Sequence, residues 1–178
     1  MKFIILFSIL YVHLIANGAR LFELYQKGSY HEACTYGYRF FATNQSNESY
    51  VSLVGFSCLK ADQIDKLSPA MSALSQSAEA RANSAYFSLL IMQKKLLMQA
   101  LYDNKPITNL QFPKSAHILS KVFNLYIKNP QNGATIKEYQ DPINARQSYT
   151  LYTTESKGRK SIAIDEYYDK ILTFHHVF

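Results

Sequence analysis

The chain changes its hydrophobic period at one strong breaker, Asn129-Pro130-Gln131-Asn132-Gly133. Before the breaker, apolar residues recur every three or four positions, as on one face of an α-helix; after it, β-forming residues predominate. A helix does not continue through this stretch, because proline lacks an amide proton and disfavours a helical conformation in the residue before it. We therefore expect a helical domain over residues 20–133 and a β-rich segment over residues 134–178.

The first nineteen residues have the order of a secretory signal peptide. Lys2 precedes an apolar run from Phe3 to Ile15, and the small-residue stretch Ala16-Asn17-Gly18-Ala19 follows it. A run of roughly 13 residues is short of the ~20 that a helix needs to cross a bilayer, so we predict cleavage within 1–19 rather than anchoring. The alternative is an uncleaved anchor or a buried first helix. The expected location is periplasmic or secreted, without stable membrane insertion after cleavage.

Residues Leu21 to Asn44 predict two helices joined by a tight turn. Gly28 can take the left-handed conformation that ends a helix, and Ser29 can cap the next one. Glu32, three residues after Ser29, completes a capping-box pattern. Further along the chain, the spacing of the apolar residues predicts one long helix over Ala80 to Tyr102 and another over Lys114 to Lys128.

The turn at Gly28 resembles the helix-to-helix turn of a tetratricopeptide (TPR) repeat, in which a glycine, an aromatic residue and an alanine recur. Here these residues are Gly28, Tyr30 and Ala33. The framework returns 34 residues later, the period of that family, with less typical residues at the same places: Asp62, Ile64 and Leu67. The resemblance covers residues 21–76 and implies a mainly α fold of TPR-like antiparallel helical pairs with a concave face for a partner.

The segment after the breaker predicts a small C-terminal β-hairpin. A short strand candidate spans Ile136 to Gln140, and two longer ones span Ser148 to Thr154 and Ser161 to Tyr168, with a turn at Lys157 to Lys160 between them. Since an isolated hairpin is barely stable in water, we expect this segment to pack on the helices and cover the end of their stack.

Two cysteines, Cys34 and Cys58, are all that the chain contains. In an oxidising compartment they can form a disulfide, provided that their Cα atoms lie within ~7 Å, which the sequence leaves open. A thiolate-imidazole pair of Cys34 with His31, three residues earlier, is the competing interpretation. We favour a small buried residue or a disulfide half at Cys34, because cysteine mostly behaves as a small hydrophobe.

Candidate partner-binding residues come from two places in the chain. Tyr25, Tyr38 and Tyr50 are expected near the groove of the helical pairs, since tyrosine gives contact area with a polar tip at little entropic cost. The competing explanation for Tyr38, and more so for Tyr30, is that they fill the core. The second place is the dense basic cluster of Lys157, Arg159 and Lys160, which could touch an anionic partner or serve only as a soluble turn tip.

The sequence carries no motif of an enzyme or a metal centre. It has no phosphate-binding glycine-rich loop, no Gly-x-Ser-x-Gly, no His-Glu-x-x-His and no clustered cysteines. Adjacent His175 and His176 point to opposite faces of a strand, and the acids Asp165, Glu166 and Asp169 form no isolated carboxylate pair. We expect no catalytic residues, no metal and no cofactor.

These features favour an exported, periplasmic TPR-like adaptor or scaffold that docks a peptide or another envelope protein. Small exported TPR-like proteins of bacterial envelope machines, flagellar motor accessories among them, are similar. The alternatives are a cell-wall-directed enzyme and a module that binds an anionic polymer or lipid. Residues 20–133 carry 12 basic and 7 acidic residues, but the lysines are mostly single and lie beside acids, which is typical of a solvated face. We therefore expect no nucleic-acid partner.

Overall fold

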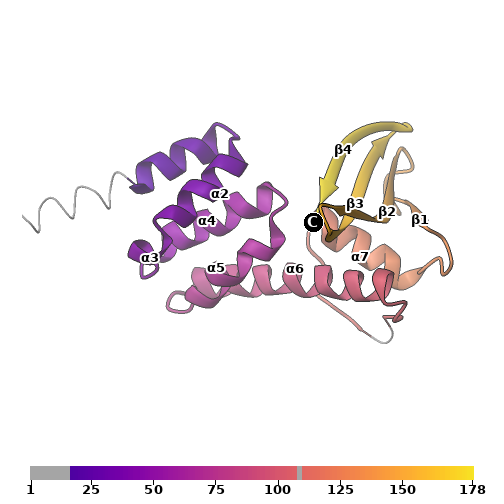
Figure 1. The fold of residues 1–178 in the computed structure, drawn as a ribbon, viewed down its shortest axis with the longest axis horizontal. Helices are drawn as coiled ribbons and strands as arrows, with labels where there is room; N and C mark the ends of the chain where they lie inside the picture. The colour runs from indigo at the N-terminus through magenta and orange to yellow at the C-terminus, as the bar shows by residue number, and fades with distance from the viewer. Residues whose placement is uncertain (1–16, 108–109) are drawn as a thin grey trace, which may run out of the picture. The chain divides into compact units, whose positions relative to one another are not determined.

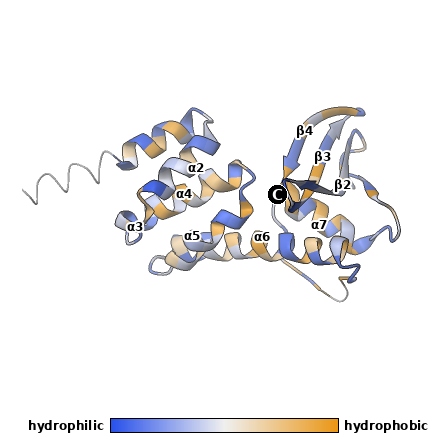
Figure 2. Ribbon diagram, in the orientation of Figure 1, coloured by the Kyte–Doolittle hydropathy of each residue, from blue (hydrophilic) through white to orange (hydrophobic). Residues whose placement is uncertain are grey.

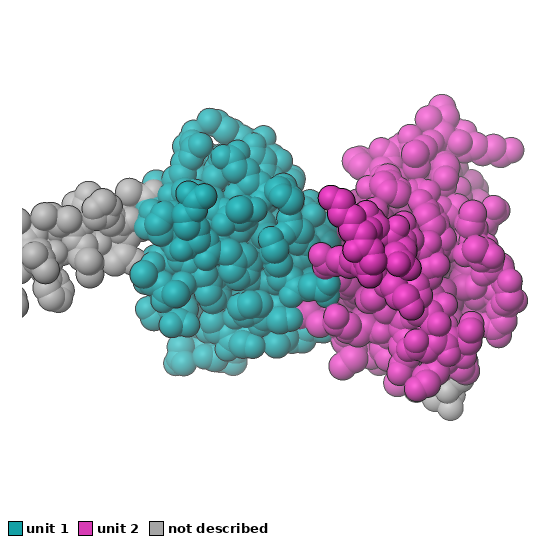
Figure 3. Space-filling view, viewed as in Figure 1, with its two compact units in different colours: residues 1–88 teal, residues 89–178 magenta. Residues whose placement is uncertain are grey.

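The computed structural model describes residues 17–107 and 110–178 and divides them into two compact units, one ending at Ser88 and one beginning at Leu89 (Figures 1 and 3). The boundary lies inside the long helix α6 (Ala78–Tyr102). The predicted division between residues 133 and 134 marks the change from helices to strands. The boundary between the two compact units lies earlier in the chain, between Ser88 and Leu89. Residues 1–16 of the predicted signal peptide lie outside the described residues, and residues 17–26 are helical.

The first unit is a set of consecutive helices. After the helix at 17–26 come α2 (Tyr30–Arg39), α3 (Phe41–Asn44), α4 (Glu48–Lys60), the short 3-10 helix η1 (Ile64–Lys66), α5 (Leu67–Ala73) and the first part of α6. Their shared core consists of apolar side chains with almost no exposed surface: Leu21, Leu24, Ala33, Val51, Val54, Ile64, Leu67 and Phe87.

Two glycines allow the helices of this unit to approach closely. A methyl group built on Gly37 would lie 2.5 Å from Cγ2 of Val54, and one on Gly55 would lie 2.4 Å from the ring of Phe87. Both distances are shorter than any carbon–carbon contact. The small residues at these positions are therefore required by packing, although glycine weakens a helix.

The turns between helices use left-handed backbone at two positions 34 residues apart. Gly28 has φ +74° before α2, and Asp62 has φ +58° after α4. The predicted capping box is wrong, because the side chain of Ser29 makes no capping hydrogen bond. Capping occurs instead at Asn47, whose Oδ1 accepts the Tyr50 N–H at 3.1 Å.

The second unit combines the end of α6 and helix α7 (Ile118–Lys128) with an antiparallel sheet. The strands are β1 (Ile136–Gln140), β2 (Gln147–Ser156), β3 (Arg159–Tyr168) and β4 (Ile171–Val177), in the order of the chain (Figure 1). The mainly α prediction with a small hairpin is therefore wrong: the fold is mixed, with a four-stranded sheet. The missing element was β4, which pairs with β3 along its length.

Alternation along the strands gives the sheet a buried face and a second face that is partly open. Tyr149, Leu151, Ile162 and Ile164 are buried, and the register places Leu151 opposite Ile164 on one face. Helix α7 contributes the other half of this core, through five buried apolar side chains: Ile118, Leu119, Val122, Phe123 and Tyr126. The sheet is thus stable because it packs on a helix.

Candidate partner-binding surface

The tyrosines predicted for a groove differ in how much surface they present. Tyr50 is only 4% exposed, and its hydroxyl donates a hydrogen bond to the Gly37 carbonyl oxygen at 3.0 Å. Tyr38 is half-buried, and its hydroxyl donates to the Lys66 carbonyl oxygen. Burial raises the pKa of each phenol to about 12. Both residues join helices together, so in this structure they serve packing.

Tyr25 and Tyr30 contact each other at the surface of the first unit. Their rings meet edge to face with centroids 5.3 Å apart, and both side chains are half-buried. Burial raises the pKa of the Tyr25 phenol. Tyr25 therefore stays available to a partner, with its ring orientation set by Tyr30.

The predicted basic cluster lies at the turn between β2 and β3. Lys157 and Gly158 form the turn with φ +51° and +75°, and Arg159 and Lys160 begin β3. The Lys160 ammonium lies 4.9 Å from the ring centre of Tyr102, so part of its charge is directed at an aromatic face. These residues share one end of the hairpin, while the predicted tyrosines belong to the other compact unit.

The end of α6 fixes this hairpin through one phenol. The Tyr102 hydroxyl lies 2.8 Å from the carbonyl oxygens of Thr154 and Ser161, and it accepts the Ser161 N–H at 3.1 Å. A phenol bridging two strands in this way holds the strand ends in register. No local sequence pattern predicts this contact, because it joins residues more than fifty positions apart.

Cys34 and Cys58 form a disulfide between α2 and α4, with their Cα atoms 4.7 Å apart. A bonded sulfur has no thiolate to offer, so the alternative pair of Cys34 with His31 does not exist in this structure. His31 instead lies 2.7 Å from the Gln63 side-chain nitrogen through its Nδ1.

Of the three acids considered for catalysis, Asp165 and Glu166 pair with the adjacent histidines, and Asp169 forms an ion pair with Arg146. His175 Nδ1 lies 2.5 Å from Asp165 Oδ1, and His176 Nε2 lies 3.0 Å from Glu166 Oε1. Because neighbouring residues of a strand face opposite sides, the two pairs fasten β4 to β3 on both faces. Within residues 17–107 and 110–178 no group of three or more histidine, cysteine or acidic side chains could hold a metal ion.

Strand β4 exposes four large apolar side chains, distributed over both of its faces, that no sequence-based prediction named. Ile171 is 70% exposed, Leu172 52%, Phe174 62% and Val177 43%. Figure 2 shows the strongly hydrophobic start of this strand. β4 is also the last strand of the sheet, so among the residues that the structure describes no strand pairs with its outer backbone groups. The enrichment of β-branched and aromatic residues over 171–178 was the available signal.

The opposite edge of the sheet is protected. β1 has five residues, includes Lys137 and Glu138, and is covered by the carboxamide of Gln131, which bonds to the Glu138 backbone. No side chain in the described part of the molecule covers the backbone of Ile171 to His175 in this way. β4 also lacks proline and any lysine, arginine or acid, which are the usual safeguards of an edge strand.

Comparisons with known proteins give no relative from which a role could be transferred. No family model, no curated protein and no solved structure matches the chain. Among the helices that the structure describes, none is both long enough and apolar enough to pass through a lipid bilayer.

Proposed function

We propose that this protein is an exported adaptor that binds an extended segment of another protein along β4. The observation that carries the proposal is an open edge strand with four exposed large apolar side chains. A strand added to such an edge gains backbone hydrogen bonds, while side chains of the partner contact the exposed apolar residues on each face of β4. Burial of apolar side chains is the main favourable contribution to most protein–protein association.

Export forms part of the proposal for two reasons. The first residues have the order of a signal peptide, and the Cys34–Cys58 disulfide is the kind of bond that persists in an oxidising compartment. We also propose that the helices of the first unit are related to TPR repeats. This relation is supported by left-handed turn residues 34 positions apart: Gly28, between the helix at 17–26 and α2, and Asp62, between α4 and η1.

Site-specific photocrosslinking tests the proposal. A benzophenone side chain at position 174, on β4, should trap a partner protein in the cells that make this chain. The same group at position 143 is the control, because Ile143 is 95% exposed but lies in the loop after β1. Adding Ile171→Lys to the position 174 variant should abolish the adduct, since a buried lysine without a partner is costly.

Three results would contradict the proposal. Equal adducts from positions 174 and 143 would show that exposure, and not β4, determines the contact. The absence of any adduct would mean that no partner binds this strand. An adduct of twice the mass of the chain, with no adduct to any other protein, would assign β4 to pairing between two copies and would remove the adaptor role.

A further inference from the structure

A second feature, unrelated to β4, is a charged side chain at a core position. Alternation along β1 buries Lys137 and Tyr139, and the register places Lys137 opposite the fully buried Leu151. Lysine is almost never buried unless it is paired. Lys137 is only 6% exposed, whereas an apolar residue at this position would satisfy the pattern of the strand. Departures from the pattern of this kind concentrate at functional sites.

The Lys137 ammonium is only partly satisfied by the protein. It donates hydrogen bonds to the carbonyl oxygens of Ala134 at 2.8 Å and Gln131 at 3.1 Å. An ammonium has three protons, so one remains. No carboxylate of the described residues pairs with it, and desolvation lowers the pKa of the amine. A buried cation without an anion is an unfavourable arrangement that a bound anion would relieve.

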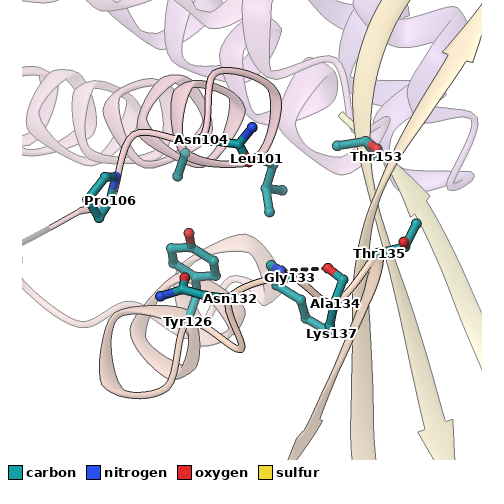
Figure 4. A pocket seen from close by; sticks show the side chains of 11 residues that line it. Leu101, Asn104, Pro106, Tyr126, Asn132, Gly133, Ala134, Thr135, Lys137 and Thr153 are labelled. Atoms are coloured by element: carbon teal, nitrogen blue, oxygen red, sulfur yellow. Dashed lines mark hydrogen bonds between the residues drawn. The ribbon is translucent and has the colours of Figure 1, made fainter.

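Lys137 lines a pocket of about 510 Å³ between the end of α6, α7 and the start of the sheet (Figure 4). This volume lies within the range of small-molecule sites. Apolar groups from Ala100, Leu101 and Pro106 form one part of the lining. The other part is polar and uncharged apart from Lys137, and consists of Asn104, Asn132, Thr135 and Thr153.

Tyr126 provides a second free donor in the same pocket. The residue is 3% exposed, and its hydroxyl makes no hydrogen bond to any residue that the structure describes. Buried tyrosine hydroxyls usually find a partner. In Figure 4 the ring of Tyr126 rises from α7 into the space that Leu101 enters from α6, with the Lys137 side chain beside it. Two free donors thus serve one pocket.

We propose that this pocket binds a small organic monocarboxylate, whose two oxygens accept hydrogen bonds from Lys137 and Tyr126 and whose apolar part contacts Leu101 and Pro106. One cation matches one negative charge, and two donors match the two oxygens of a carboxylate. A phosphate carries more charge and more acceptors than these two groups satisfy. The proposal is independent of β4, because none of its residues belongs to that strand.

Titration of the ¹⁵N-labelled protein with hexanoate, hexanamide and inorganic phosphate tests the inference by NMR. Hexanoate should shift the backbone amide signals of residues 132–137 in a saturable manner, whereas hexanamide, which has the same shape without the charge, should not. An equal response to hexanoate and hexanamide would overturn the inference. So would a response to phosphate alone, or no saturable response at these amides.

Two matched tyrosine substitutions separate binding from stability. Tyr126→Phe removes a hydroxyl that makes no hydrogen bond within the described protein, so it should leave the melting temperature unchanged and weaken hexanoate about five-fold, the ratio for ~1 kcal/mol. Tyr139→Phe removes a hydroxyl that donates to the Asn129 carbonyl oxygen and lies outside the pocket lining. It should lower the melting temperature without changing affinity. An unchanged hexanoate affinity in Tyr126→Phe, or an equal loss of affinity in Tyr139→Phe, would contradict the assignment of the Tyr126 hydroxyl to the carboxylate.

Lys137→Met is the stronger variant and should weaken hexanoate at least ten-fold. Because Lys137 also bonds to the loop carbonyls, this substitution could disturb the fold, and Tyr126→Phe keeps the inference testable in that event. A Lys137→Met protein that folds and binds hexanoate as tightly as the wild type would contradict the assignment.

Discussion

The side chain of Gln131 hydrogen-bonds to both backbone groups of Glu138: its Nε2 donates to the carbonyl oxygen at 2.5 Å, and its Oε1 accepts the N–H at 3.0 Å. The carboxamide thus occupies the place that a neighbouring strand would take. It closes the β1 edge of the sheet, and β4 is left as the open one. This asymmetry is the basis of the proposed partner-binding surface.

The first prediction concerns that asymmetry. Phe174→Lys should leave the free energy of unfolding within about 0.5 kcal/mol, because the side chain is largely exposed, and should reduce self-association at high concentration. Gln131→Ala uncovers the β1 edge and should therefore increase self-association. Sedimentation velocity and thermal unfolding measure the two effects. A large loss of stability in Phe174→Lys would show that the ring belongs to the core.

The second prediction concerns the disulfide. Cys34 and Cys58 are 24 residues apart, and a loop of this length should contribute about 3 kcal/mol to the free energy of unfolding, largely by restricting the unfolded chain. The double substitution to serine should lower the urea midpoint accordingly. Reductant should lower the midpoint of the wild type and leave the double variant unchanged. Alkylation of both thiols in the untreated protein would contradict the bond.

The third prediction is a pH dependence that rests on Glu48. Its carboxylate accepts the backbone N–H groups of Ser75, Gln76 and Ser77, just before α6, and these bonds lower the pKa of the carboxyl group from 4.5 to about 2. A lowered folded-state pKa stabilises the protein above the unfolded value. The contribution is therefore complete above pH 4.5 and is lost as the pH falls toward 2.

Glu48→Gln isolates this effect. The amide keeps the shape of the side chain but cannot titrate, so the difference in urea midpoint between wild type and variant should shrink as the pH falls from 5 to 2.5, roughly the span over which the group titrates. A difference that stays constant over this range would show that the carboxylate charge does not stabilise the start of α6.

The fourth prediction concerns Gly55 and Phe87. Alanine favours a helix by about 1 kcal/mol over glycine, yet Gly55→Ala should lower the free energy of unfolding by about 1–3 kcal/mol, because its methyl group meets the buried Phe87 ring. Adding Phe87→Leu makes room and should recover part of the loss. Additive effects of the two substitutions, measured in a double-mutant cycle, would mean that the residues do not compete for space.

Elements set by local residues could be predicted from the sequence. Gly28 takes the left-handed conformation expected at the end of the first helix, and the breaker at residues 129–133 separates α7 from β1. β4 was missed as a fourth strand because its turn, Asp169-Lys170, contains neither glycine nor asparagine. Both residues nevertheless have positive φ, 49° and 67°, as a two-residue hairpin turn requires.

The sequence by itself determined where the chain is helical, where it becomes β-rich and which residues can end a helix, because these depend on periodicity and on the conformational limits of nearby residues. Only the tertiary structure decided that Tyr50 is buried, that Glu48 binds the backbone just before a helix that begins thirty positions later, and that Lys137 lines a pocket. Each of these depends on contacts between residues distant in the chain, which no local pattern encodes.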